Sequence, residues 1–184
     1  MKKRLYILVE GEDDVRFFGR VMKPLFISRY DTIEIIPYAS IKRIKVNNFL
    51  KSMAEMKNDY IFVADIDTER SVRDKKQLIY HWYSNINGSN IVVVVIEIES
   101  WYYAGLPDNV LQRLGLPNLQ ETDELTKEDF NALIPPPFDS RIDFMFEILK
   151  FFSPATAARR NRSFKFFFER YRLEDPLAVT PSSP

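Results

Sequence analysis

The sequence predicts an α/β protein with a Rossmann-like, mostly parallel central β-sheet flanked by helices, followed by a helical C-terminal extension. Three short apolar runs, at residues 5–9, 60–64 and 91–96, have the length of buried strands. The segments between these runs are long enough to hold the crossover helices that join parallel strands. Each of the three runs also ends in carboxylates, which the strands of a parallel sheet would bring to one edge.

The first run leads directly into glycine and acidic residues. Gly11 favours a tight turn after the strand. Asp13 and Asp14 follow where a helix is expected to begin, and the helix macrodipole favours acids in a first turn. Apolar residues then recur at spacings of three and four as far as Leu25, which predicts an amphipathic helix. Glu10 is therefore expected at the carboxyl end of a central strand, where open α/β sheets bind ligands.

The following elements alternate in the same way. A β-branched run over residues 32–38 predicts a strand that ends near Pro37, and residues 41–57 predict a helix. The strand at 60–64 precedes Asp65 and Asp67, and a helix is expected around residues 78–83. The most β-prone run, 91–96, leads into Glu97 and Glu99, which we expect at the end of that strand.

The second half of the chain has a different character. Short helical patterns occupy residues 108–114 and 141–152, with a helix start at Thr126 and a stiff break at Pro135-Pro136-Pro137. We therefore expect an α/β domain over residues 1–105 and a helical part over residues 106–175 packed on it. The Pro- and Ser-rich tail, residues 176–184, is expected to be disordered.

The composition restricts the chemistry. The chain has 184 residues, with 26 basic and 26 acidic side chains, no cysteine and a single histidine, His81. Disulfides and Cys-ligated metals are excluded, so a metal would be a hard cation held by oxygen, such as Mg²⁺ or Mn²⁺. The apolar run near the N-terminus is too short for a signal peptide, and nothing approaches the about 18 apolar residues of a membrane span. We expect a cytoplasmic protein with no membrane partner.

Six carboxylates are candidates for that cation. Any one of them is equally well explained as a polar residue of a loop or helix start. Acids at three strand ends are harder to explain in this way, because they would repel one another unless a cation neutralised them. Their number is compatible with one or two metals. The candidate ligands are Glu10, Asp14, Asp65, Asp67, Glu97 and Glu99.

These motifs resemble those of a known family. The segment from Val9 to Asp14, with Glu-Gly after an apolar strand and an acid three residues past the glycine, resembles the first Toprim motif. The segment from Ala64 to Asp67 resembles the Toprim Asp-x-Asp motif. The stretch from Ile96 to Ala104 is similar to the Glu-Ile-Glu-Ala-Trp segment of short stand-alone OLD-like (overcoming lysogenization defect) Toprim proteins, with Ser100 in place of alanine. Residues 161–167 resemble their late Ser-Phe-x-x-Phe stretch.

The resemblance implies a Mg²⁺- or Mn²⁺-dependent nuclease that hydrolyses DNA or RNA, acting as an effector of a bacterial anti-phage or abortive-infection system. It assigns the metal to Glu10, Asp65 and Asp67, assisted by Asp14 and by Glu97 or Glu99. Toprim glutamates also act as general acid or base. The predicted catalytic residues are Glu10, Asp14, Glu99 and Lys165, the last of which would offset developing charge.

Two interpretations of the remaining features stay open. Arg159, Arg160, Arg162 and Lys165 alternate with phenylalanines, a pattern that suits nucleic-acid binding but also suits a helix with aromatic core residues and solvated basic ones. The alternative function is a non-catalytic Toprim-like module that binds nucleic acid or a partner ATPase encoded nearby. OLD-type nucleases are often coupled to an ATPase, and the sequence contains no Gly-Lys-Ser/Thr phosphate loop. A homo-oligomer is compatible with either interpretation.

Overall fold

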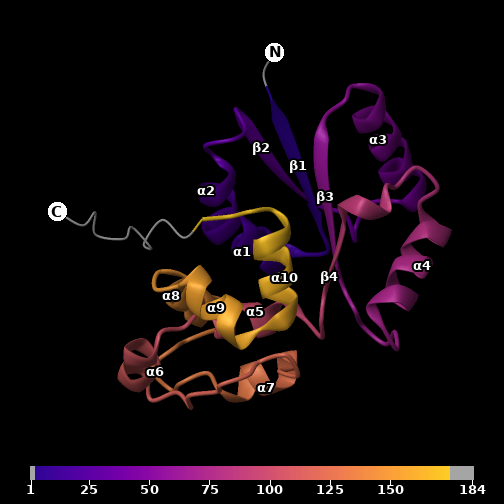
Figure 1. The fold of residues 1–184 in the computed structure, drawn as a ribbon. Helices are drawn as coiled ribbons and strands as arrows, with labels where there is room; N and C mark the ends of the chain where they lie inside the picture. Colours follow the sequence, from indigo (N-terminus) through magenta and orange to yellow (C-terminus); the bar gives the residue numbers. More distant parts are fainter. Residues whose placement is uncertain (1–2, 175–184) are drawn as a thin grey trace. The chain divides into compact units, whose positions relative to one another are not determined.

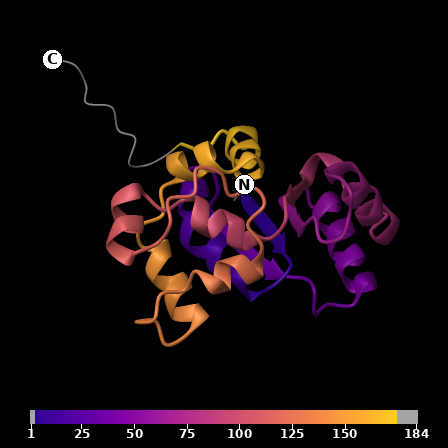
Figure 2. The same cartoon turned by 90° about the horizontal axis from the view of Figure 1, so that it is seen from below.

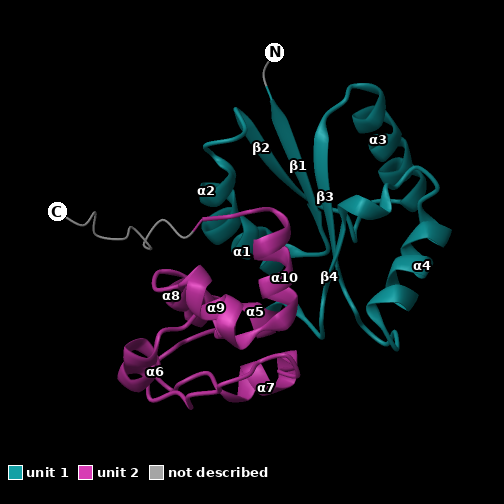
Figure 3. Ribbon diagram, in the orientation of Figure 1, with its two compact units in different colours: residues 1–98 teal, residues 99–184 magenta. Residues whose placement is uncertain are grey.

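A computed structural model describes residues 3–174, and the predicted tail at 176–184 lies outside this range. The chain divides into two compact units, residues 1–98 and 99–184 (Figure 3). Within the described range, no helix combines the length and the apolar character needed to cross a bilayer.

The first unit contains a four-stranded sheet in which every pairing is parallel (Figure 1). The strands are β1 (Arg4–Val9), β2 (Thr32–Pro37), β3 (Asp59–Asp65) and β4 (Ile91–Val94), in the order β2-β1-β3-β4. This arrangement confirms the predicted fold class, a mixed α/β protein with a Rossmann- or Toprim-like parallel sheet. The central strands β1 and β3 are almost completely buried, which agrees with their uninterrupted apolar runs.

Helices cover both faces of this sheet. The even-numbered side chains of β1 and β3, such as Leu8 and Phe62, pack with α3 (Arg43–Glu55) and α4 (Val72–Trp82) in one core cluster. Figures 1 and 2 both show α3 and α4 side by side. A continuous helical segment follows β1, consisting of α1 (Glu12–Phe17), the π-helix η1 (Phe18–Met22) and α2 (Lys23–Phe26). A short 3₁₀ turn, η2 (Gly88–Asn90), precedes β4.

The turn after β1 differs from the expectation based on glycine. Gly11 has an extended backbone, with a φ of −142°, and a Cβ added there would lie 4.0 Å from Asp14 Oδ2. The turn therefore does not require glycine sterically. It is fixed instead by Asp14, whose Oδ2 accepts a hydrogen bond from the Gly11 N–H at 3.1 Å. The predicted helix start is confirmed, with Asp13 and Asp14 in the first turn of α1.

The last strand is shorter than its β-prone sequence predicts. β4 ends at Val94, and Ile96 has a left-handed backbone with a φ of 65°, a rare conformation for a β-branched residue. Glu97 consequently lies in the connection after the strand, and Glu99 lies in helix α5 (Ile98–Ala104). The expectation that both acids end the strand is therefore wrong, because the reversal at Ile96 starts a helix.

The described part of the second unit is helical. After α5 it contains α6 (Asp108–Leu114), α7 (Lys127–Ala132), α8 (Arg141–Leu149), α9 (Pro154–Arg160) and α10 (Arg162–Arg170). Thr126 caps α7 by accepting a hydrogen bond from the Asp129 N–H, as the sequence predicts. Asn161 separates α9 from α10 and caps α10 through the Phe164 N–H.

Candidate functional site

The topology brings two of the acidic motifs to one place. From β1 the chain moves to β2 on one side, and later returns to β3 on the other side, so the strand order reverses between β1 and β3. In open α/β sheets ligands bind beyond the carboxyl ends of the strands at such a switch point. Glu10 follows β1 directly, and Asp65 is the last residue of β3. Both predicted residues therefore lie at the switch point.

Glu10 is held by three groups from three different segments. Its Oε1 accepts a hydrogen bond from the Asp65 backbone N–H at 3.1 Å and lies 3.2 Å from the Tyr38 hydroxyl. The Lys75 ammonium lies 3.9 Å from the same oxygen. The Tyr38 hydroxyl is also 3.0 Å from the Val63 carbonyl oxygen. Because these contacts all involve Oε1, they fix the orientation of the carboxylate.

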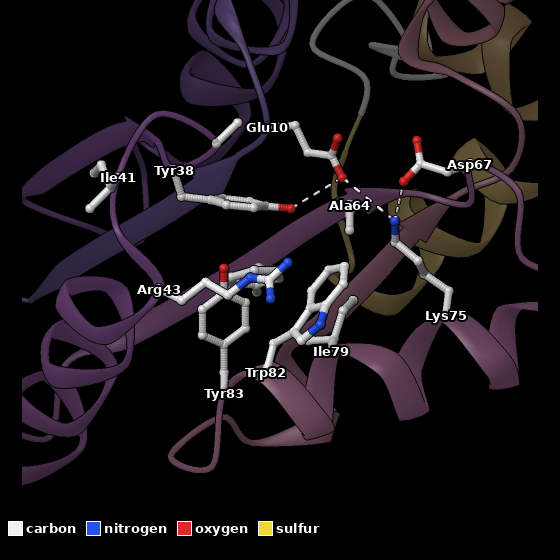
Figure 4. A pocket seen from close by; sticks show the side chains of 12 residues that line it. Glu10, Tyr38, Ile41, Arg43, Ala64, Asp67, Lys75, Ile79, Trp82 and Tyr83 are labelled. Atoms are coloured by element: carbon white, nitrogen blue, oxygen red, sulfur yellow. Dashed lines mark hydrogen bonds and ion pairs between the residues drawn. The ribbon is translucent and has the colours of Figure 1, made fainter.

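Lys75 connects the two carboxylate motifs. Its ammonium forms an ion pair with Asp67 as well as its contact with Glu10, although Lys75 is only 2% exposed (Figure 4). Asp67 has a left-handed φ of 51°, a conformation that Asp tolerates better than most residues. The turn after β3 therefore directs the Asp67 carboxylate towards Lys75 on α4. Two acids and one buried cation form the polar centre of the site.

The electrostatics of this centre oppose the charged form of Glu10. Burial raises the pKa of Glu10 above its ordinary value, and the negative charge of Asp67 raises it further. Lys75 and the hydrogen bonds from Asp65 and Tyr38 lower that pKa without cancelling the increase. Burial also raises the pKa of Tyr38 well above its ordinary value, with the negative charge of Glu10 as the next cause. Tyr38 therefore remains protonated and able to donate a hydrogen bond.

A cavity of about 230 Å³ opens beside these carboxylates, within the first unit (Figure 4). Glu10, Asp67 and Lys75 form its polar side. The remainder of the wall is largely aromatic and aliphatic, and comprises Tyr38, Ala39, Ile41, Arg43, Phe62, Ala64, Ile79, Trp82 and Tyr83. The cavity therefore combines paired carboxylates and a cation with aromatic and aliphatic side chains.

The carboxylates at this edge of the sheet are of the kind that can bind Mg²⁺. Magnesium is commonly held by one or two carboxylates while water and substrate phosphates complete its coordination. Glu10 and Asp67 already share one cationic partner, Lys75, so these two side chains fit that pattern. Within residues 3–174, no group of three or more acidic or histidine side chains is placed to hold a metal by itself. The metal and its ligands remain predictions.

The other predicted ligands have different surroundings. Asp14 is buried and caps the start of α1. Glu97 is half-buried in the connection after β4. Glu99, in the second unit, is 3% exposed and forms an ion pair with Arg141 of α8. Catalytic or metal-binding roles for Asp14, Glu97 and Glu99 stay predictions.

The basic cluster divides into one buried residue and three more exposed ones. Arg160 is buried, donates to the Leu106 carbonyl at 2.6 Å and forms an ion pair with Asp108, which indicates a structural role. Arg162 forms an ion pair with Asp123, yet most of its side chain is exposed. Arg159 lies near Thr156, and Lys165 near Glu169. Nucleic-acid binding by these four residues, and catalysis by Lys165, stay predictions.

The late Ser-Phe-x-x-Phe motif has a clear structural partner within the second unit. Trp101 donates its indole N–H to Ser163 Oγ at 2.8 Å. Its ring also packs against Phe164 and Phe167, with centroid distances of 5.1 and 5.5 Å. Ser100, where alanine is usual in the resembled proteins, lies 3.3 Å from the Asn161 side-chain amide. These two motifs therefore form one packing unit, and their aromatic residues belong to the core.

The sequence interpretation missed Lys75, Tyr38 and Arg43. A signal for Lys75 is present, because it lies four residues before Ile79 on the apolar face of its helix, where a lysine is unusual. Tyr38 directly follows β2, at the same edge of the sheet as Glu10. Arg43 lies in a short basic stretch with no motif of its own, and its neighbour Trp82 is distant in sequence.

Tyr38→Phe tests the hydrogen bond to Glu10. Removing the hydroxyl takes away an interaction that lowers the Glu10 pKa, so we expect that pKa to rise further. The measurement is a carboxyl-carbon NMR titration of Glu10. Tyr60→Phe is the control, because the Tyr60 hydroxyl accepts from the Asn87 N–H instead. An unchanged or lower Glu10 pKa in Tyr38→Phe would contradict the assignment.

Comparison with known proteins gives little independent information. No protein-family model matches the chain, and a search of curated proteins finds no match. Among solved structures, the chain is similar to the C-terminal region of the OLD protein of Xanthomonas campestris pv. campestris. The two are 17% identical, with a TM-score of 0.40, and the match covers 92% of this chain and 94% of the other.

Proposed function

We propose that this protein is a Mg²⁺- or Mn²⁺-dependent nuclease of the Toprim/OLD-like type that hydrolyses phosphodiester bonds in DNA or RNA. The observation that carries the proposal is the pairing of Glu10 and Asp67 around one cationic group at the switch point of the sheet. Glu10, Asp67 and Lys75 also line a cavity at this edge of the sheet. The sequence motifs of the chain resemble those of effectors of bacterial anti-phage systems. This resemblance supports a defence role in the cytoplasm.

The residues suit distinct tasks in hydrolysis. Glu10 and Asp67 would hold the metal, with Asp65 beside them at the strand end. A divalent ion held by these carboxylates would supply Lewis-acid chemistry, polarising the phosphate and making water easier to deprotonate. Lys75 is positioned to offset the negative charge that develops on the phosphate oxygens. Glu10 would also serve as the general base that accepts a proton from the attacking water.

One observation favours the alternative, a non-catalytic Toprim-like module. The Lys75 ammonium already contacts both Glu10 and Asp67, so the carboxylates are partly neutralised without a metal. A module of this kind would bind nucleic acid or a partner ATPase through the same unit. Cleavage and metal binding distinguish the two functions.

The test is a cleavage assay on single-stranded and duplex DNA and RNA, with Mg²⁺, Mn²⁺ or EDTA. We expect cleavage with either metal, none with EDTA, and a loss of about 100-fold or more in Asp67→Asn. Asp59→Asn is the matched control, because Asp59 lies at the opposite end of β3 and is exposed. Cleavage in EDTA, or full activity in Asp67→Asn, would refute the proposal. Metal binding below detection by calorimetry, with no cleavage, would favour the alternative.

A further inference from the structure

The cavity wall next to the carboxylates contains a stacked pair that the hydrolysis of a phosphodiester does not require. The Arg43 guanidinium lies over the Trp82 ring, 4.2 Å from its centroid. Arg43 is the first residue of α3, and Trp82 is the last residue of α4. Two helices that are separate in sequence thus present a planar cation and the largest aromatic ring to the same space (Figure 4).

The inner wall of the cavity is also aromatic. Tyr38 is stacked on Phe62, with ring centroids 4.4 Å apart and an interplanar angle of 26°. Tyr38 and Tyr83 are buried, Trp82 is half-buried and Arg43 is exposed. The accessible part of the wall is therefore the Arg43–Trp82 pair, while the two tyrosines form a fixed base beneath it.

The dimensions limit what can enter. At about 230 Å³, the cavity is smaller than the roughly 300–1,000 Å³ of pockets that hold drug-sized ligands. The volume therefore suits an occupant smaller than a drug-sized ligand, such as a single aromatic ring system. Within the described chain Arg43 pairs with no carboxylate, so its guanidinium edge remains available for hydrogen bonds to a ligand.

We propose that this cavity receives one unstacked nucleobase of the substrate, in a nucleotide next to the scissile phosphate. Proteins hold splayed bases by stacking them on aromatic rings and guanidinium planes, which are the groups at this wall. Glu10, Asp67 and Lys75 line the same cavity, so a base seated there brings its own phosphate to them. The inference rests on the proposed nuclease function and specifies its substrate.

This geometry selects a class of nucleic acid. A base inside an intact duplex must be unpaired and unstacked before it can enter, at a cost that single strands and frayed ends largely avoid. We therefore expect single-stranded regions, mismatches or strand ends to be cut in preference to continuous duplex. Stacking tolerates all bases, so the preference concerns strand structure more than sequence.

The first experiment measures binding without cleavage. Deoxynucleoside 5′-monophosphates are added to the wild-type protein in the presence of Ca²⁺, and tryptophan fluorescence is recorded. The chain has two tryptophans, and Trp101 is buried in the second unit. We expect saturable quenching that disappears in Trp82→Leu and is about 5- to 150-fold weaker in affinity in Arg43→Ala. Arg73→Ala, an exposed arginine on α4, is the control and should bind normally.

The second ligand in that experiment is 2-deoxyribose 5-phosphate, which lacks a base. We expect it to bind at least about fivefold more weakly than the monophosphates. Equal affinity would show that only the phosphate is recognised and would overturn the inference. Monophosphate binding that is unchanged in both Trp82→Leu and Arg43→Ala, measured by calorimetry, would also overturn it.

The third experiment scans a single abasic site along an oligonucleotide that the protein cleaves. We expect one position next to the cut to lower cleavage by about 5- to 150-fold, and the same scan to be flat in Trp82→Leu. A flat scan with active wild-type protein would overturn the base pocket while the nuclease function stands. Absence of any cleavage would refute the nuclease instead, and the monophosphate binding data would then decide whether the base pocket exists.

Discussion

Glu10→Gln is expected to lose at least about 100-fold of cleavage activity while becoming more heat-stable than the wild type in the absence of metal. Loss of activity follows because glutamine can neither hold a divalent cation strongly nor accept a proton. The gain in stability follows from the raised pKa of Glu10, since its charged form is disfavoured by burial and by Asp67. Glutamine retains an oxygen that can accept from the Tyr38 hydroxyl and the Asp65 N–H.

The pH dependence of this stability difference has a definite sign. The folded pKa of Glu10 lies above its unfolded value, so the folded state binds more protons between the two values. The contribution of Glu10 to stability is therefore fully present below the unfolded pKa and is lost as pH rises through the folded pKa. The difference in melting temperature between Glu10→Gln and wild type, both measured without metal, should widen as the pH rises over that interval.

Calorimetric melting with and without Mg²⁺ provides the measurement. Mg²⁺ should raise the melting temperature of the wild type and have a smaller effect on Glu10→Gln, because a ligand stabilises only the state that binds it. Glu55→Gln is the control, since Glu55 is exposed near the end of α3 and its contact is with Lys51. A melting temperature lower in Glu10→Gln than in wild type, without metal, would contradict the electrostatic account of the site.

Lys75→Met is expected to destabilise the metal-free protein and to reduce cleavage. Methionine fills a similar volume but leaves Glu10 and Asp67 facing each other without their shared cation. Because the Asp67 side chain is 54% exposed and solvent screens that pair, the expected loss is about 1–3 kcal/mol rather than the full cost of breaking a buried ion pair. Losing a group that offsets charge on the phosphate should lower the cleavage rate by about 100-fold.

Metal binding separates these two effects of Lys75. Denaturant unfolding should show that Mg²⁺ restores more stability to Lys75→Met than it adds to wild type, because the ion replaces the missing positive charge. The cleavage rate should stay low at saturating Mg²⁺. Lys51→Met, an exposed lysine on α3, is the matched control and should change neither quantity. Full activity in Lys75→Met would remove Lys75 from the proposed mechanism.

The strands could be predicted from the sequence wherever the β-propensity of a segment agrees with its place in the folded sheet. The apolar runs of β1 and β3 are buried on both faces, so their composition alone identifies them as central strands. The end of β4 could not be predicted, because residues 91–96 are uniformly β-prone while Ile96 takes a left-handed backbone that its side chain disfavours. That conformation has no signature in the residue itself.

In the candidate site, too, some residues could be predicted from the sequence and others could not. Glu10 and Asp67 could be predicted because acids after buried strands are visible in the sequence and a parallel sheet brings such ends together. Lys75, Tyr38 and Arg43 could not be assigned in this way. Each reaches the site from a different element, and their mutual distances depend on how α3 and α4 pack on the sheet. Packing of that kind is decided by the whole core and not by local spacing.

The strand order has a consequence for synthesis of the protein on the ribosome. Glu10 belongs to the first strand, but its partners Asp65 and Lys75 are made 55 and 65 residues later. At about 5–20 residues per second, the growing chain spends roughly 3–13 s with Glu10 made and its cationic partner absent. A nascent fragment that ends before α4 cannot assemble the site. The cell that makes this protein therefore meets a complete site only after the start of α4, in the third crossover connection, has been synthesised.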